Sequence, residues 1–262
     1  MEVNYDRLIL GSDIPINENV TIHIPTIREL ADGQISDYMV FTRVFVTTVR
    51  EQFSGAPSDV DKIEEKFPTF WDMMFDEEMN QVVGQMMFGE GIDLMSVAVH
   101  GLAYWTKTDV EGFRPLSNHK IVNEKLNWII DSKEYEQFCN YIRMITLSEP
   151  NEDLIAPKGI SSKPRQCQVW LQLYKGRIRS LQKKGKSLGD KILLLQALAP
   201  SYFSFRQIGE LTAYQFENLL ITYQKRMANE RDFAMFTAYK FDSDKIKLSN
   251  LSEEVGLVKL KK

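Results

Sequence analysis

The tripeptide Gly185-Lys186-Ser187 has the residue types that end a phosphate-binding loop, in which backbone N–H groups and a lysine hold phosphate oxygens. A complete loop needs a second glycine five residues before Gly185 and a strand leading into it. The sequence has Ser180 at that position, and the pattern before it is helical. We therefore interpret the tripeptide as a basic turn on the surface.

Histidine is the side chain most often used for proton transfer near neutral pH, and it is a common metal ligand. The three histidines of the chain are His23, His100 and His119. None of them lies within helical reach of another histidine, a cysteine or a pair of carboxylates, and no Gly-x-Ser-x-Gly motif is present. We expect all three histidines to be structural or exposed.

Three consecutive carboxylates, Asp76, Glu77 and Glu78, are the remaining candidates for acid–base catalysis or magnesium binding. Consecutive residues of a helix point in different directions, so acids in a row usually mark an exposed helix N-terminus. We predict a protein that is not an enzyme and that has no catalytic residues, no cofactor and no metal site.

The composition is that of a globular protein, with 262 residues of which 44% are apolar and 26% charged. Cys139 and Cys167 have no partners at zinc-binding spacing, so we predict neither a disulfide nor a zinc site. The sequence shows no signal-peptide pattern and no apolar run approaching the roughly 18 residues of a membrane span. We expect a soluble protein without membrane contacts.

The small net charge of −4 hides a strong segregation of charge along the chain. Residues 1–157 carry 12 basic and 27 acidic side chains, whereas residues 158–191 carry 10 basic and 1 acidic. The remaining residues, 192–262, carry 10 and 8. The segment 158–191 is therefore a basic island in an otherwise acidic sequence.

The spacing of apolar residues predicts a mainly α-helical, α+β fold. We expect a short N-terminal β-hairpin from strands over 8–10 and 20–24, and a small antiparallel β element between 104 and 131. Capping-box patterns at Thr26–Glu29 and Thr212–Gln215 each predict a helix start. Further helices are expected over 36–53, 58–67, 77–88, 92–103, 131–147, 166–183 and 188–198, and the last long helix should run from Thr212 past Arg226 towards Lys240.

Prolines, glycines and serines between Ser148 and Arg165 coincide with the change of charge and predict a linker. The predicted organisation is an acidic helical domain, a linker, a basic helical domain and a tail, over 1–150, 151–165, 166–241 and 242–262. Methionines at helical spacing in the first domain fit either a core or an adaptable binding surface, and we favour the core. These methionines are Met73, Met74, Met79, Met86, Met87 and Met95.

The basic island contains the candidate partner-binding residues of the chain. They are Trp170, Tyr174, Lys175, Arg177, Arg179, Lys183, Lys184, Lys186 and Lys191. Cations interleaved with aromatic rings suit a nucleic acid bound over 175–191, but the acidic remainder of the chain would repel it. Docking on an acidic protein surface, either of this chain's N-terminal half or of a neighbouring subunit in an oligomer, is the interpretation that we favour.

Three runs of sequence resemble a family of bacteriophage proteins encoded among tail-morphogenesis genes, especially of phages that infect Gram-positive bacteria. The runs are Val20 to Leu30, Gly176 to Lys186 and Leu211 to Phe216. The resemblance implies a tail or baseplate component or a tail assembly chaperone, whose partners are other tail or baseplate proteins. It also implies a location in the host cytoplasm during assembly or in the tail of the virion.

Overall fold

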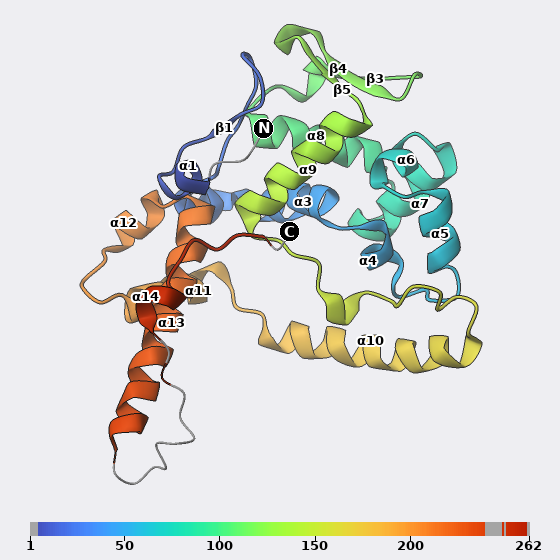
Figure 1. The fold of residues 1–262 in the computed structure, drawn as a ribbon. Coiled ribbons are helices and arrows are strands. Elements are labelled where there is room, and N and C mark those ends of the chain that lie inside the picture. The colour runs from blue at the N-terminus through green and yellow to red at the C-terminus, as the bar shows by residue number, and fades with distance from the viewer. Residues whose placement is uncertain (1–4, 239–247, 249, 261–262) are drawn as a thin grey trace. The chain divides into compact units, whose positions relative to one another are not determined.

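A computed structural model describes residues 5–238, 248 and 250–260, apart from the side chains of Gln34 and Lys184. The described residues form two compact units (Figure 1). Unit 1 draws on 1–13, 24–33 and 186–262, and unit 2 on 14–23 and 34–185. The chain is mainly helical with two small antiparallel sheets, which confirms the predicted α+β class.

These two units follow different boundaries from the organisation expected from composition. The segment 151–165, expected to be a linker, belongs to unit 2, and the change from unit 2 to unit 1 falls between Gly185 and Lys186. Unit 1 also takes two short segments from the N-terminal part of the chain. Its residues are therefore brought together from three separate stretches of sequence.

Unit 2 contains most of the helices and both sheets. Its helices are α3 (Ile35–Val46), α4 (Val49–Phe53), α5 (Val60–Lys66), α6 (Phe70–Met74), α7 (Glu77–Phe88), α8 (Leu94–Thr106), α9 (Ser132–Thr146) and α10 (Pro164–Lys184). Short 3-10 turns occur at η2 (Val110–Gly112), η3 (Glu124–Leu126) and η4 (Glu152–Leu154). The strands are β1 (Ile14–Pro15), β2 (Thr21–Ile22), β3 (Phe113–Leu116), β4 (Lys120–Asn123) and β5 (Trp128–Ile130).

The core of unit 2 forms where α3 packs against α8 and α9. Phe45 of α3 is fully buried and lies edge-on to Phe138 of α9, with ring centroids 4.9 Å apart. Gly101 of α8 lets α3 approach α8 closely, because a Cβ atom on Gly101 would lie 2.6 Å from Cε2 of Phe45. The absence of one side chain thus sets the spacing of two core helices.

Both β predictions are confirmed as elements, but the first strand of the hairpin was misplaced. β1 pairs antiparallel with β2, whereas residues 5–9 form the helix α1 (Tyr5–Ile9) of unit 1. Gly11, at φ 78°, ends this helix with hydrogen bonds from its own N–H to the carbonyl of Leu8 and from the Ser12 N–H to that of Arg7. Helices commonly end at a glycine in this conformation. The apolar run 8–10 before Gly11 was instead interpreted as a strand.

The helix predicted over 36–53 is interrupted. α3 ends at Val46, and Thr48 begins α4 by accepting a hydrogen bond from the Glu51 N–H at 3.2 Å. The pattern of a threonine followed three residues later by a glutamate signals a helix start, and it lies inside the predicted helix. The small antiparallel β element predicted within 104–131 is present as a three-stranded sheet, in which β4 lies between β3 and β5.

Unit 1 contains the remaining helices. They are α1, α2 (Ile27–Glu29), α11 (Leu188–Leu198), α12 (Phe205–Glu210), α13 (Ala213–Thr237) and α14 (Leu251–Glu254), and the π-helical turn η1 (Leu30–Gln34) follows α2 and leads into α3. Both predicted capping boxes are present, at Thr26–Glu29 and Thr212–Gln215. The two caps also pair with each other as an antiparallel bridge between Thr26 and Thr212.

The expected C-terminal tail is partly described. Residues 242–247, 249, 261 and 262 lie outside the described ranges, whereas 250–260 contain α14 and belong to unit 1. The N–H of Val258 donates to Oδ1 of Asn218 at 2.9 Å, and the hydroxyl of Tyr214 donates to the Val258 carbonyl at 3.2 Å. The described part of the tail is therefore held against α13.

The methionines divide between core and surface. Met73, Met74 and Met87 are buried, and Met79 and Met95 are half-buried. Met86 is 49% exposed. The core interpretation fits the first three, while Met86 lies on the outer surface of α7. Within the described residues, no helix is long and apolar enough to cross a membrane.

Candidate functional site

Helix α10 carries most of the predicted partner-binding residues. Pro164 occupies its first turn, where a missing N–H costs nothing. Cys167 and Trp170 are buried, and the indole N–H of Trp170 donates to the Ser54 carbonyl at 2.7 Å. Tyr174 lies against Gly55, where an added Cβ would come within 3.4 Å of the tyrosine ring. One face of α10 is thereby fixed to the body of unit 2.

Trp170 and Tyr174 thus belong to the inner face of α10 and do not form an exposed aromatic platform. Arg177 is also engaged within the unit. Its guanidinium lies 3.5 Å from the Asp153 carboxylate, donates to the Asp153 carbonyl, and sits 5.7 Å from the centroid of the Trp170 ring. These three residues attach α10 to the chain that precedes it.

The outer face of α10 presents a row of three cations, Lys175, Arg179 and Lys183. They are spaced by four residues, so they follow one another along the same side of the helix. All three are exposed, and none forms an ion pair with an acidic side chain in the described ranges. We call these residues the cation row.

The other predicted cations are separated from the cation row. Lys186 and Lys191 belong to unit 1, and Nζ of Lys191 forms an ion pair with Glu217 of that unit at 2.6 Å. The side chain of Lys184 lies outside the described residues. The basic island of the sequence is therefore divided between two units.

An apolar hollow beside α10 was missed from sequence. It has a volume of about 280 Å³ and is lined by Pro157, Ile160, Arg165, Gln166, Val169, Trp170 and Leu173. Val169 and Leu173 are 54% and 50% exposed. Their spacing of four residues on a helix indicates a shared apolar face. The prediction from sequence considered only the cations and aromatic rings of this segment.

The wall of this hollow is held in place by a buried arginine of α4. Arg50 pairs with Asp61 and Glu64 of α5 and donates to the carbonyls of Ala156 and Pro157. Asp61 accepts further hydrogen bonds from the N–H groups of Gly159 and Ser161. Its hydrogen bond with Arg50 is the main reason that the pKa of Asp61 is well below its usual value.

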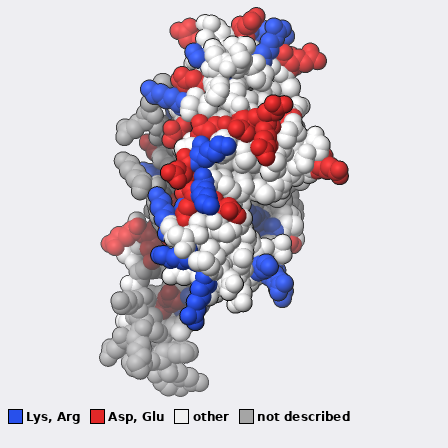
Figure 2. All heavy atoms as spheres, turned by 90° about the vertical axis from the view of Figure 1, so that its right-hand side faces the viewer, with Lys and Arg blue, Asp and Glu red and all other residues white. Residues whose placement is uncertain are grey.

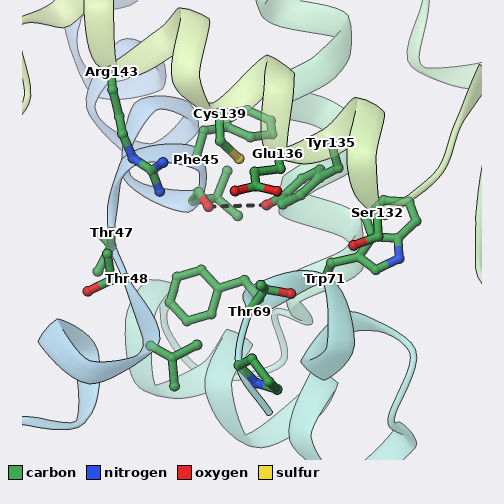
Figure 3. Close-up of a pocket in the computed structure, with 14 residues that line it drawn as sticks. Phe45, Thr47, Thr48, Thr69, Trp71, Ser132, Tyr135, Glu136, Cys139 and Arg143 are labelled. Atoms are coloured by element: carbon green, nitrogen blue, oxygen red, sulfur yellow. Dashed lines mark hydrogen bonds between the residues drawn. The ribbon is translucent and has the colours of Figure 1, made fainter. Parts of the chain in front are cut away.

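A second hollow, of about 120 Å³, lies between α9 and α6 (Figure 3). Figure 3 shows side chains of α9 directed into it, including Cys139, Tyr135, Glu136 and Arg143. Burial raises the pKa of the Cys139 thiol to about 12, and it raises the pKa of the Tyr135 hydroxyl as well. The thiol is protonated near neutral pH and is therefore a poor nucleophile.

Three of the other groups singled out for chemistry, His119, His100 and Asp76, have structural partners. His119 stacks on Phe75 at 4.7 Å, and His100 stacks on Phe41 at 6.4 Å. Asp76 caps α7 by accepting from the Met79 N–H, while Glu77 and Glu78 are exposed on its first turn. The described residues include no cluster of three or more His, Cys, Asp or Glu side chains that could hold a metal ion.

The tripeptide Gly185-Lys186-Ser187 connects α10 to α11. Ser187 caps α11 and forms a capping box with Asp190, whose carboxylate accepts from the Ser187 N–H at 3.1 Å. A carboxylate thus already occupies the helix start, where a phosphate would need free N–H groups. Helix α10 precedes the tripeptide, as the sequence pattern predicted.

On the face drawn in Figure 2, acidic side chains form a band across the upper half and also lie above it, and basic side chains lie above, among and below the band. Comparison of the chain with protein-family models, curated proteins and solved structures finds no match. The outer surface of α10, comprising the cation row and the apolar hollow, is the candidate interaction site.

Proposed function

We propose that this chain is a non-enzymatic structural or assembly protein of a bacteriophage tail or baseplate, and that it acts by binding other proteins. The observation that carries the binding part is the outer surface of α10. There, Lys175, Arg179 and Lys183 lie on the same helix as exposed Val169 and Leu173. Exposed apolar side chains supply affinity in protein interfaces, and the surrounding charges select the partner.

The resemblance to tail-morphogenesis proteins supports the phage part of the proposal. Two of its three sequence runs meet in unit 1, where the Ile27 N–H donates to the Leu211 carbonyl and the Ala213 N–H to the Pro25 carbonyl. Residues that cap helices and pair backbones indicate a shared architecture more than a shared binding surface. The remaining run, Gly176 to Lys186, contains Arg179 and Lys183 of the cation row.

The proposal is tested by replacing the cation row in the virus that encodes the chain. We expect Lys175→Glu/Arg179→Glu/Lys183→Glu to reduce the number of tailed particles, counted by electron microscopy, by at least tenfold. The matched control, Lys62→Glu/Lys125→Glu/Lys133→Glu, changes the net charge equally at exposed sites of the same unit and should leave the count unchanged.

Mass spectrometry of purified intact virions then distinguishes the two forms of the proposal. A chain found in the virion is a structural component, and a chain that is absent but required for tails is an assembly chaperone. Normal tail numbers in the cation-row variant would overturn docking through α10. Normal tail numbers after deletion of the whole gene would overturn the tail function itself.

Nucleic acid is the alternative partner, because a row of cations also suits a phosphate backbone. A protein partner is favoured because Trp170 is buried and Tyr174 faces Gly55. Neither ring is free to stack on bases, as the aromatic side chains of single-strand-binding proteins do. Filter binding of a single-stranded oligonucleotide across salt concentrations decides between them. Three phosphate contacts predict a log–log slope of about −2, whereas we expect no measurable binding at physiological salt.

A further inference from the structure

Helix α7 of unit 2 has an exposed face that complements the surface of α10. Val82 and Met86 are 48% and 49% exposed, and they are four residues apart. Glu78 precedes Val82 by four residues on the same helix face, and Glu90 follows Met86 by four, just beyond the helix end. All four side chains are exposed, and together they form what we call the acidic row.

The opposite face of α7 is already used. Val83 and Met87 are buried, and a Cβ added to Gly84 would lie 2.4 Å from the carbonyl oxygen of Ile92. This face packs against α8 and the backbone leading into it. The apolar members of the acidic row, Val82 and Met86, therefore lie on a second face of α7, which the folding of unit 2 does not bury.

Helix α10 has a row with the same spacing and the opposite charge. Arg165, Val169, Leu173 and Arg177 follow one another at intervals of four residues. Val169 and Leu173 line the apolar hollow, and a cation lies one turn beyond each of them. Arg165 is exposed, whereas Arg177 also pairs with Asp153 of its own unit. Glu78, Val82 and Met86 on α7 thus match a base followed by two apolar side chains on α10, and Glu90 adds a second acid in the turn after α7.

We propose that the acidic row of one copy of this chain docks on the α10 row of a second copy. Residues four apart form the ridges by which helices most often interdigitate, so the two rows are suited to direct packing. Met86 would enter the apolar hollow, because a methionine side chain adapts to irregular spaces. The contact deepens the proposed function, on which it rests, by naming a like subunit as one partner.

Charge also sets the direction of the contact. With the two helices antiparallel, Glu78 lies towards the C-terminal half of α10, where Lys175, Arg179 and Lys183 add positive potential. Glu90 then lies towards Arg165. The two rows are different surfaces of one unit, so repeated contacts build a ring or a filament unless two copies pair reciprocally.

Sedimentation velocity of the full chain tests the proposal. We expect wild-type protein to self-associate with a dissociation constant in the micromolar range or weaker, since two helix faces bury less than roughly 1,200 Å². Val82→Asp/Met86→Asp and Val169→Asp/Leu173→Asp should each weaken self-association at least tenfold. Leu116→Asp/Ile129→Asp, at exposed apolar positions of β3 and β5, is the matched control and should not.

Mixing the two interface variants gives the decisive result. Each retains one intact surface, so the mixture should form a one-to-one complex although neither variant associates alone. Likewise, Glu90→Arg and Arg165→Glu should each weaken self-association, and their mixture should restore it. Circular dichroism melting identifies a variant that has failed to fold, and Met86→Asp alone then replaces the α7 double variant.

Wild-type protein that stays monomeric up to millimolar concentration would overturn this proposal. So would self-association that both double variants leave unchanged, or a mixture that does not restore it. The proposed function is measured separately, by tail numbers in the cation-row variant and in the gene deletion, and these numbers can fall even where the chain does not self-associate. Failure of the self-contact is therefore distinguishable from failure of the proposed function.

Discussion

At the scale of single residues, Arg50 and Asp61 show how a charge is used inside unit 2. Arg50 is buried, and it connects α4 to α5 and to the segment 156–161. A buried charge is tolerated only when it is paired and hydrogen-bonded, and Asp61 supplies both kinds of contact. The pair thereby secures a stretch that composition alone marks as a linker.

We predict that Asp61→Asn lowers the free energy of unfolding by about 2 kcal/mol near pH 7, as expected for the loss of hydrogen bonds to charged groups. The folded-state pKa of Asp61 is lowered, so its stabilising contribution is present above the unfolded pKa of about 3.9 and is lost as pH falls further. Urea unfolding of both proteins should give a constant difference between pH 7 and about 5.

Below about pH 4 this difference should shrink, because the wild-type carboxyl group starts to take up a proton in the unfolded state. Asp109→Asn, at an exposed position in the turn before η2, is the control. It should change stability by less than about 0.5 kcal/mol. A difference for Asp61→Asn that persists unchanged to pH 2 would contradict the role assigned to the ion pair.

At the scale of elements, most helices and all three strands between 113 and 130 could be predicted, because caps and periodicity are local signals. The capping pattern of Thr48 and Glu51 indicated the start of a new helix inside 36–53. The apolar spacing on both sides of Thr48 nevertheless favoured one continuous helix. The hollow on α10 could not be predicted as a whole. Pro157 and Ile160 form its far wall, and the stretch that carries them is held in place by hydrogen bonds from Arg50, which lies more than a hundred residues earlier in the chain.

Two helical glycines give an element-scale prediction with an internal control. Gly101→Ala should destabilise unit 2, because the new Cβ meets the Phe45 ring at 2.6 Å and overpacking costs about 1–3 kcal/mol. Gly176→Ala in α10 has nothing within 4 Å of the new Cβ. It should stabilise the helix by roughly 0.5–1 kcal/mol.

Thermal unfolding monitored at 222 nm measures both changes. We expect the midpoint to fall for Gly101→Ala and to rise or stay level for Gly176→Ala. Equal stabilisation by both substitutions would mean that α3 and α8 can move apart without loss, and that Gly101 does not set their spacing.

At the scale of the whole molecule, charge segregation and residue contacts divide the chain at different places. The sign of charge changes near residue 158, whereas contacts place the boundary after Gly185. Composition reports what a segment carries, while a unit is defined by which segments touch. The pairing of Thr26 with Thr212 is a long-range contact of this kind, and no spacing in the sequence announces it.

This organisation predicts how fragments behave. Residues 186–262 alone should lack a cooperative thermal transition, because α13 loses the backbone bridge to Pro25 and Ile27 and the hydrogen bond from Gln215 to the Ile9 carbonyl. Residues 14–185 contain all of unit 2 and should unfold cooperatively. Circular dichroism melting of the two fragments checks this, and a cooperative melt of 186–262 alone would contradict it.

The bridge between Thr26 and Thr212 also has a consequence for synthesis on the ribosome. The early segment 24–33 emerges almost two hundred residues before the strand partner that it needs. Unit 2 can therefore fold while unit 1 is still waiting for its C-terminal part. Unit 1 can therefore complete its fold only after Thr212 has been synthesised, whatever the intrinsic folding speed of its parts.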